Sequence, residues 1–383
     1  MKNNRLVYIA GLILAAILLK FGLVNFLAEK YSLAIRLTSM MIILGIGAGV
    51  VLSGCAKIIE ETTDVLSKRT KLAGGMLQSL GTAFPDMALG LVAAIISLQL
   101  RQVDYAKAVE FAIMAAATTF GSNIYNIAHA AWCVFRQNLA CKKNQAILMF
   151  PGFKSGGMVK PIKDHLRKPN LIELDTVTDI LSALTLMTAA VAISMVLFGK
   201  VIPPAGMSGD LYQLIKPVGV IILMICLGIM FYFRKTKRAI ATEAEEEEEK
   251  KYYSQQTNGV IFLHLLISGG VILLAAESMV HAVQIGSEIT GLPVVAAGVL
   301  AGIIGCLGEM LVVHNYSVHP NGRIADALIG VGMDNIVTTM GAAIVAIIGG
   351  VFLGGNALIM IFVIILSLNT MLIWQISRLK NWV

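Results

Sequence analysis

The chain has 383 residues, of which 57% are hydrophobic and 14% are charged. This composition is too apolar for a soluble domain and is typical of a protein that crosses a membrane several times. The net charge of +7 would permit binding to nucleic acid, but the placement of the basic residues gives another reason for it and argues against a nucleic-acid partner.

Apolar stretches of about 20 residues, long enough to span a bilayer as a helix, occur ten times. They cover approximately residues 6–28, 38–59, 72–99, 108–135, 177–199, 212–233, 259–282, 292–314, 324–350 and 354–377. We therefore expect an all-α, polytopic membrane protein with about ten transmembrane helices in a lipid bilayer. The first stretch contains Lys20 and lacks a small-residue cleavage site, so we expect a retained helix rather than a signal peptide.

Lys and Arg residues between these stretches predict the orientation, because cytoplasmic segments of membrane proteins are rich in them. With the N-terminus inside, the cytoplasmic segments include the basic stretches 136–168 and 234–251. The outside segments hold only Lys30, Arg36, Arg101, Lys107, Lys200 and Lys216. This asymmetry predicts a multi-pass protein of the cell (inner or plasma) membrane with both termini in the cytoplasm.

The acidic stretch TEAEEEEEKK divides the chain into two halves. Its composition is typical of a solvated linker, with calcium sensing as the alternative. The predicted parts are an extra N-terminal transmembrane helix (1–35), a first half with spans two to six and a cytoplasmic loop at 136–176 (36–233), an acidic cytoplasmic linker (234–258), and a second half with spans seven to ten (259–383).

Five cysteines occur without a C-x-x-C pair, and most lie in apolar stretches. This pattern favours free thiols packed between helices over disulfides or a resident metal, so we expect no cofactor. The cysteines are Cys55, Cys133, Cys141, Cys226 and Cys306.

The two halves carry similar motifs. GTAFPDMALGLVAA at 81–94 aligns with IGCLGEMLVV at 304–313, and this alignment pairs Asp86 with Glu309. These carboxylates lie in the third and eighth predicted spans, which cross the membrane in opposite directions. Opposite crossing is what two inverted-topology repeats require.

A second pair of motifs follows the first in each half. FGSNIYNIAHAA at 120–131 aligns with GMDNIVTTMGAA at 332–343. The aligned polar pairs are Ser122 with Asp334, Asn123 with Asn335, and Asn126 with Thr338. Each half therefore has one helix with a central carboxylate and one with clustered polar side chains.

GTAFPD followed by GSNIYN resembles the first alpha-repeat of the cation/calcium exchanger superfamily, whose pattern is roughly G-T-S-x-P-E and then G-S-N-x-x-N. The resemblance covers about residues 38–350 and includes the place of the acidic cytoplasmic loop. It implies a sodium/calcium exchanger-like antiporter with two inverted repeats, and not an enzyme. The second repeat is divergent, because IGCLGE lacks the Thr, Ser and Pro of the pattern.

The motifs space their key residues four apart, so that each pair shares a helix face. The pairs are Thr82 with Asp86, Ser122 with Asn126, Gly305 with Glu309, and Asp334 with Thr338. Hard cations such as Ca²⁺ prefer oxygen ligands of this kind. A carboxylate at the bilayer centre costs about 2.5–3.5 kcal/mol on insertion scales, which favours ion binding over idle packing for these acidic groups.

Pro85 lies one position before the first carboxylate. It has no N–H and its ring clashes with the carbonyl of Gly81, so we expect a kinked or broken helix that leaves this carbonyl as a cation ligand. Glycines at 302, 305 and 308 predict a similar bend in the second half. The predicted metal-binding residues are Asp86, Glu309, Thr82, Ser122, Asn126, Asp334, Thr338 and Gly81.

These residues predict a secondary active transporter whose substrates are inorganic cations, exchanging Ca²⁺ or a related divalent ion for Na⁺. Proton coupling is an alternative, because Ala83, Gly305 and Cys306 stand where the resemblance implies hydroxyl groups. The divergent second repeat also leaves open a scaffold or sensor that no longer transports. The oligomeric state is not determined by the sequence.

An intramembrane aspartyl protease that uses Asp86 and Asp334 is the main enzymatic alternative, because GVGMD resembles the G-x-G-D motif of such enzymes. A methionine separates the last glycine from the aspartate, and GTAFPD has no role in that chemistry. We therefore expect a protein that is not an enzyme.

Overall fold

The computed structural model describes residues 2–70, 74–166, 168–198, 217, 219–232, 252–318, 324–348 and 356–383. For some helical residues in these ranges, among them 74–82, 191–198 and 307–309, it describes the backbone alone. Most of the acidic linker predicted at 234–258 lies outside the described residues.

Helices make up nearly all of the described chain, in agreement with the predicted all-α class. The long helices are α1 (Lys2–Ile17), α2 (Leu33–Ile46), α3 (Ser53–Thr70), α4 (Gly74–Leu100), α5 (Tyr105–Lys143), α6 (Leu171–Phe198), α8 (Asn258–Thr290), α9 (Val294–Gly305), α10 (Leu307–Val318), α11 (Ile324–Ile348) and α12 (Asn356–Leu379). Another helix covers Gly219–Tyr232. Two π-helical turns lie at Leu18–Gly22 and Gly47–Leu52, and 3-10 turns lie at Leu23–Leu27, Ile162–Asp164, Tyr252–Gln255 and Lys380–Trp382.

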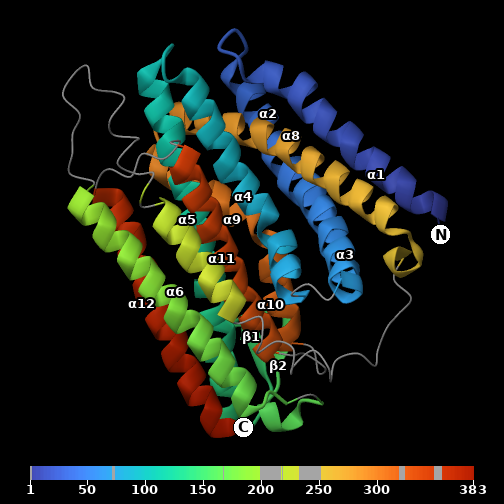
Figure 1. The fold of residues 1–383 in the computed structure, drawn as a ribbon, viewed down its shortest axis with the longest axis vertical. Coiled ribbons are helices and arrows are strands. Elements are labelled where there is room, and N and C mark those ends of the chain that lie inside the picture. The colour runs from blue at the N-terminus through green and yellow to red at the C-terminus, as the bar shows by residue number, and fades with distance from the viewer. Residues whose placement is uncertain are drawn as a thin grey trace.

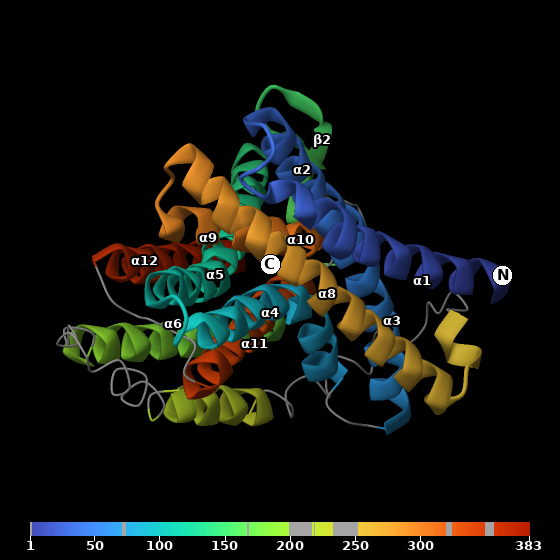
Figure 2. The same ribbon diagram turned by 90° about the horizontal axis from the view of Figure 1, so that it is seen from above.

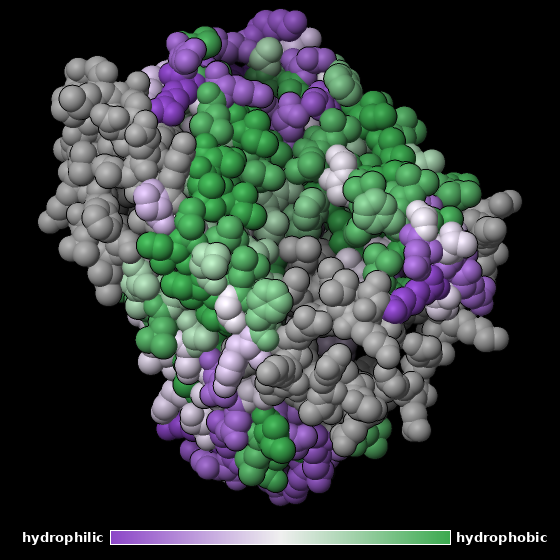
Figure 3. All heavy atoms as spheres, in the orientation of Figure 1, coloured by the Kyte–Doolittle hydropathy of each residue, from purple (hydrophilic) through white to green (hydrophobic). Residues whose placement is uncertain are grey.

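Within the described residues, six helical segments are long and apolar enough to cross a membrane. They are Arg5–Leu27, Leu33–Thr63, Ala83–Leu100, Asn258–Thr290, Ala327–Ile348 and Ile359–Trp382. The four other predicted spans coincide with α5, α6, the helix Gly219–Tyr232, and α9 followed by α10. An apolar band across the middle of the face drawn in Figure 3, with hydrophilic side chains at both ends, agrees with a multi-pass membrane protein.

Helix α8 lies between two groups of helices. It contacts α1, α2 and α3 on one side and α4 and α9 on the other, and Figure 2 shows this arrangement from above. Helices α5, α6, α11 and α12 pack together beyond α4. The hairpin and the C-terminus lie at one end of the molecule, and the turn between α1 and α2 lies at the opposite end (Figure 1).

An ion pair joins the π-helical turn after α1 to α8 within the apolar segments. Lys20 lies in the π-helical turn Leu18–Gly22, and its Nζ atom is 2.7 Å from Glu277 Oε2. Both side chains are partly exposed on the helix surface, where each charge alone would be costly to place in lipid. The pairing therefore holds the N-terminal helix against the bundle.

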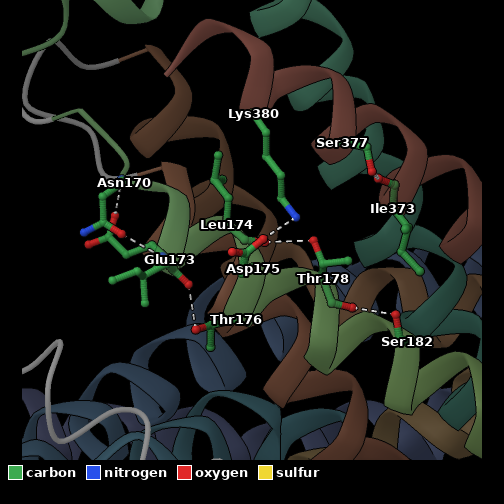
Figure 4. A network of polar contacts seen from close by, with 11 residues as sticks. Asn170, Glu173, Leu174, Asp175, Thr176, Thr178, Ser182, Ile373, Ser377 and Lys380 are labelled. Atoms are coloured by element: carbon green, nitrogen blue, oxygen red, sulfur yellow. Dashed lines mark hydrogen bonds and ion pairs between the residues drawn. The ribbon is translucent and has the colours of Figure 1, made fainter.

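A second set of polar contacts ties α6 to α12 at the end of the molecule that carries the C-terminus (Figure 4). Lys380 Nζ lies 2.7 Å from Asp175 Oδ1. The start of α6 is closed by a reciprocal capping pair, in which the Asn170 backbone N–H donates to Glu173 Oε2 and the Glu173 N–H donates to Asn170 Oδ1. Such a capping box satisfies two backbone donors that a helix start leaves free.

The loop predicted at 136–176 is more ordered than the sequence suggested. Helix α5 continues to Lys143, and an antiparallel hairpin follows, formed by β1 (Ile147–Phe150) and β2 (Phe153–Val159). Its turn contains Gly152 at φ +86°, a left-handed conformation that favours glycine. The five cysteines are free and buried, which confirms that prediction.

Helix α9 packs against α5 through glycines four residues apart. A Cβ atom at Gly298 would lie 2.7 Å from Ala117 Cβ, and one at Gly302 would collide with the Thr118 carbonyl oxygen. This small-x-x-x-small spacing lets the two backbones approach closely, as is common between membrane helices. The close approach brings the end of α9 to the middle of α5.

We predict that Gly302→Ala lowers the thermal stability of the protein. The new methyl group has to displace the Thr118 backbone, and overpacking of this kind costs about 1–3 kcal/mol. Gly330→Ala in α11 is the matched control, because no atom lies within 4 Å of its added Cβ, and we expect it to be neutral or to gain about 0.5–1 kcal/mol. Heating followed by size-exclusion chromatography in detergent measures both, and equal melting temperatures would contradict the described contact.

Candidate cation site

Asp86 lies in the middle of α4 and is 1% exposed. Neither carboxylate oxygen accepts a hydrogen bond from the described residues. Ser122 and Asp334 nevertheless lie near enough to act on its charge. A buried carboxylate that lacks donors is expensive, so this side chain is the starting point for any function of the site.

Of the kink or break predicted at Pro85, the break was wrong. Helix α4 runs from Gly74 to Leu100 with Pro85 inside it. Neighbouring helices can support a proline within a membrane helix, since they cover the backbone that the ring disturbs. Pro85 has no N–H to donate to the Gly81 carbonyl, and the role of that carbonyl as a cation ligand stays a prediction.

The second half carries the interruption that its glycines predicted. Helix α9 ends at Gly305, Cys306 leaves the helical conformation at φ −90° and ψ 9°, and α10 begins at Leu307. This junction touches the carboxylate of the first half, because a Cβ atom at Gly305 would collide with Asp86 Oδ1. Cys306 is fully buried, with its Sγ atom 4.0 Å from the Ser122 carbonyl oxygen.

Helices α5 and α11 supply the polar side chains around the junction. Ser122 is fully buried, and its hydroxyl donates to the Thr119 carbonyl at 3.0 Å. Asp334 on α11 is 6% exposed, and its backbone carbonyl accepts a hydrogen bond of 2.8 Å from the Thr338 hydroxyl. Asn126 is also buried on α5.

The structure thus brings together Asp86, Ser122, Asp334 and the α9–α10 junction. Asn126 and Thr338 lie one turn beyond Ser122 and Asp334 on the same helices. Thr82 and Gly81 lie in α4 one turn before Asp86, and Glu309 lies in α10 one turn after Gly305, but the side chains of Thr82 and Glu309 fall outside what the structure describes.

Two buried asparagines lie next to Ser122 and Asp334 in the sequence and were absent from the predicted ligand set. Asn123 Nδ2 donates to Thr339 Oγ1 at 3.3 Å, which joins α5 to α11. Asn335 is fully buried, and neither its Oδ1 nor its Nδ2 has a hydrogen-bond partner among the described residues. The alignment of the two halves already paired these residues, and that pairing was the signal that could have identified them.

The arrangement offers a cation two carboxylates, hydroxyl and amide oxygens inside an apolar bundle. Among the described side chains, no group of three or more His, Cys, Asp or Glu residues forms a compact metal site. A cation bound here would therefore use hydroxyl, amide and backbone oxygens beside the acidic groups, as Ca²⁺ sites commonly do.

Comparison with known proteins identifies the fold. No family model matches the sequence, and no curated protein sequence matches it. The chain is similar over nearly its whole length to native YfkE. The superposition covers 98% of this chain and 96% of the YfkE chain with a TM-score of 0.55, at 14% sequence identity. At this identity, native YfkE and the present chain share a fold, and the residues of the site must be argued from this structure alone.

We predict that Ca²⁺ raises the melting temperature of the purified protein and that Asp334→Asn weakens this effect. A ligand at a hundred times its Kd stabilises a protein by about 2.7 kcal/mol, and loss of one carboxylate weakens the attraction for a divalent ion. Asp175→Asn is the control, because Asp175 is an exposed carboxylate in the ion pair with Lys380. An equal Ca²⁺ effect in both variants would contradict a role for Asp334 in binding.

Proposed function

We propose that the protein is a secondary cation antiporter that exchanges Ca²⁺, or a related divalent cation, for a monovalent counter-ion. The observation that carries the proposal is the Asp86 carboxylate, which is buried, has no hydrogen-bond donor among the described residues and faces a helix junction. Its negative charge, with that of Asp334 nearby, requires neutralisation by protons or by a bound cation before it is stable in an apolar bundle.

The proposal includes ten membrane spans and two inverted repeats. Helix contacts support this finer description, because α4 packs against α11 and α9 packs against α5. In each contact, the span that carries the carboxylate in one half packs on the span with the clustered polar side chains in the other half. Two inverted repeats are expected to pack in this way. In this arrangement Glu309 belongs to the second carboxylate helix, as Asp86 belongs to the first.

Both termini and the hairpin are proposed to face the cytoplasm, in a cell membrane. The basic stretch 136–168 contains the hairpin, and the hairpin and the C-terminus lie at the same end of the molecule (Figure 1). The enrichment of cytoplasmic segments in Lys and Arg supports this orientation.

Exchange follows from competition for the same acidic groups. A site with unneutralised carboxylates cannot face the apolar barrier that separates the two sides, so it reorients only when a divalent ion or the counter-ions are bound. Na⁺ is the proposed counter-ion on the resemblance of GTAFPD to the sodium/calcium exchangers. H⁺ is the alternative, and Cys306 favours it because a sulfur stands at the junction where a sodium site would use oxygen.

We predict that Asp86→Asn abolishes ⁴⁵Ca²⁺ uptake by reconstituted vesicles, and that Glu309→Gln does the same. Each substitution removes a charge and leaves the size of the side chain almost unchanged, so the protein should still fold. Glu173→Gln, at the start of α6 and away from the site, should transport normally. Normal uptake by both site variants would defeat the proposal, and Ca²⁺-dependent stabilisation without uptake by the unmodified protein would indicate a sensor instead.

We predict that an outward or inward Na⁺ gradient drives ⁴⁵Ca²⁺ flux at fixed voltage. The same vesicles under a pH gradient, without Na⁺, provide the comparison. Flux that follows only the pH gradient would replace Na⁺ by H⁺ as the counter-ion and leave the site unchanged.

A further inference from the structure

A cluster of rings lies between α5, α10 and the hairpin. Phe150, the last residue of β1, stacks on His314 of α10 with ring centroids 5.6 Å apart and an interplanar angle of 6°. It also lies 6.4 Å from the ring of His129 on α5, and the two histidine rings are 6.1 Å apart. One aromatic side chain of the hairpin thus rests on a histidine from each of two helices.

The two histidines lie at similar distances along their helices from the candidate site. On α5, Ser122, Asn126 and His129 share one helix face because they are four and three residues apart. His129 therefore lies about 10 Å along the helix from Ser122. On the other side, His314 lies eight residues after Cys306, whose Sγ atom touches the Ser122 carbonyl.

Partly exposed side chains lie between the candidate site and the cluster of rings. Tyr125 is half-buried and lies between the two positions, within electrostatic reach of Cys306 and stacked 6.4 Å from His129. His129, His314 and Phe150 are half-buried as well. Phe150 therefore lies at the end of a row of polar side chains that begins beside Asp86.

The hairpin is bound to α5 by hydrogen bonds. Trp132 Nε1 donates to the Met149 carbonyl at 3.2 Å, Arg136 Nε donates to the Leu148 carbonyl at 3.1 Å, and Gln137 Nε2 donates to the Lys160 carbonyl at 2.6 Å. These bonds use backbone carbonyls of the hairpin region, so they do not depend on the Phe150 side chain.

The contacts that the structure gives between the hairpin and α10 are of another kind. Phe150 stacks on His314, and Gly157 at φ +78° lets β2 approach Val318, whose Cβ would lie 3.0 Å from an added Cβ. Stacking and van der Waals contacts of this kind are individually weak and can be broken by a small displacement. The hairpin is thus fastened to α5 and rests on α10.

We propose that the hairpin is the cytoplasmic gate of the ion path and that Phe150 is its plug, seated on His129 and His314. The junction at Cys306 is the proposed hinge, because the helical conformation is interrupted there, between α9 and α10. Movement of α10 then carries His314 away from Phe150 and opens the end of the polar row. This inference rests on the proposed function, since a gate requires a path to close.

Access to Cys306 tests the gate without measuring transport. Cys306 is fully buried beside the site, so a small, membrane-impermeant thiol reagent added to inside-out vesicles should label it slowly. Phe150→Ala should raise that labelling rate several-fold, and the same reagent added to right-side-out vesicles should show no increase. Peptide mass spectrometry identifies the labelled cysteine, so the four other cysteines can be retained.

Phe153→Ala is the matched control. Phe153 faces Phe150 across the hairpin turn but is 69% exposed, so its removal should leave the labelling of Cys306 unchanged. If Phe150→Ala does not fold, Phe150→Leu should also raise the labelling rate of Cys306. Leucine keeps an apolar side chain between the two histidines and removes the flat ring that stacks on His314. Labelling of Cys306 at the unmodified rate in a folded Phe150 variant would overturn the gate.

The two proposals fail in different experiments. Labelling reports access to Cys306, and it does not depend on which ion is transported or whether any ion is transported. Faster labelling of Phe150→Ala in a protein that takes up no ⁴⁵Ca²⁺ would support the gate and contradict the proposed exchange.

Discussion

The burial of the Asp86 carboxylate constrains the rest of the structure. A charged group at membrane depth is costly, and neither oxygen of this carboxylate has a close hydrogen-bond partner among the described residues. The side chain is stable there only with a cation, with protons, or with both in turn. The helix junction at Cys306 and the second carboxylate at Asp334 lie beside this one charge, and the proposed exchange needs a site whose bound ion is replaced by another ion rather than simply released.

Small residues make this arrangement possible. Gly305 leaves room for the Asp86 carboxylate at the junction, and Gly302 brings α9 against the Thr118 backbone of α5. Side chains at these positions would hold the helices apart, and the oxygen atoms would no longer converge. The same glycines lower the helix propensity of α9. The segment that approaches the site most closely is therefore also the segment whose helix is interrupted, and both properties come from its glycines.

The molecule also distinguishes parts that are fastened from parts that only rest on one another. Ion pairs join Lys20 to Glu277 and Lys380 to Asp175, and hydrogen bonds fasten the hairpin to α5. The contact of Phe150 with His314 is a ring stack. In the proposed gate, movement at the Cys306 junction breaks this stack, because α10 carries His314 and a ring stack is an individually weak contact.

The sequence alone determined the helical class and the six long apolar segments of the described chain, and it singled out the acidic groups of the candidate site, because hydrophobic length and isolated charges are local properties of the chain. Alignment of the two halves paired Asp86 with Glu309 and Ser122 with Asp334 before any contact was known. Only the tertiary structure decided where helices continue or stop, because this depends on the residues packed around them. Helix α4 runs through Pro85 because packed helices cover the backbone there, whereas α9 stops at Gly305, where the carboxylate from α4 occupies the space. The hairpin lies in a stretch whose composition predicted a basic loop. Side chains of α5, distant from any local pattern, donate the hydrogen bonds that hold its β1 carbonyls.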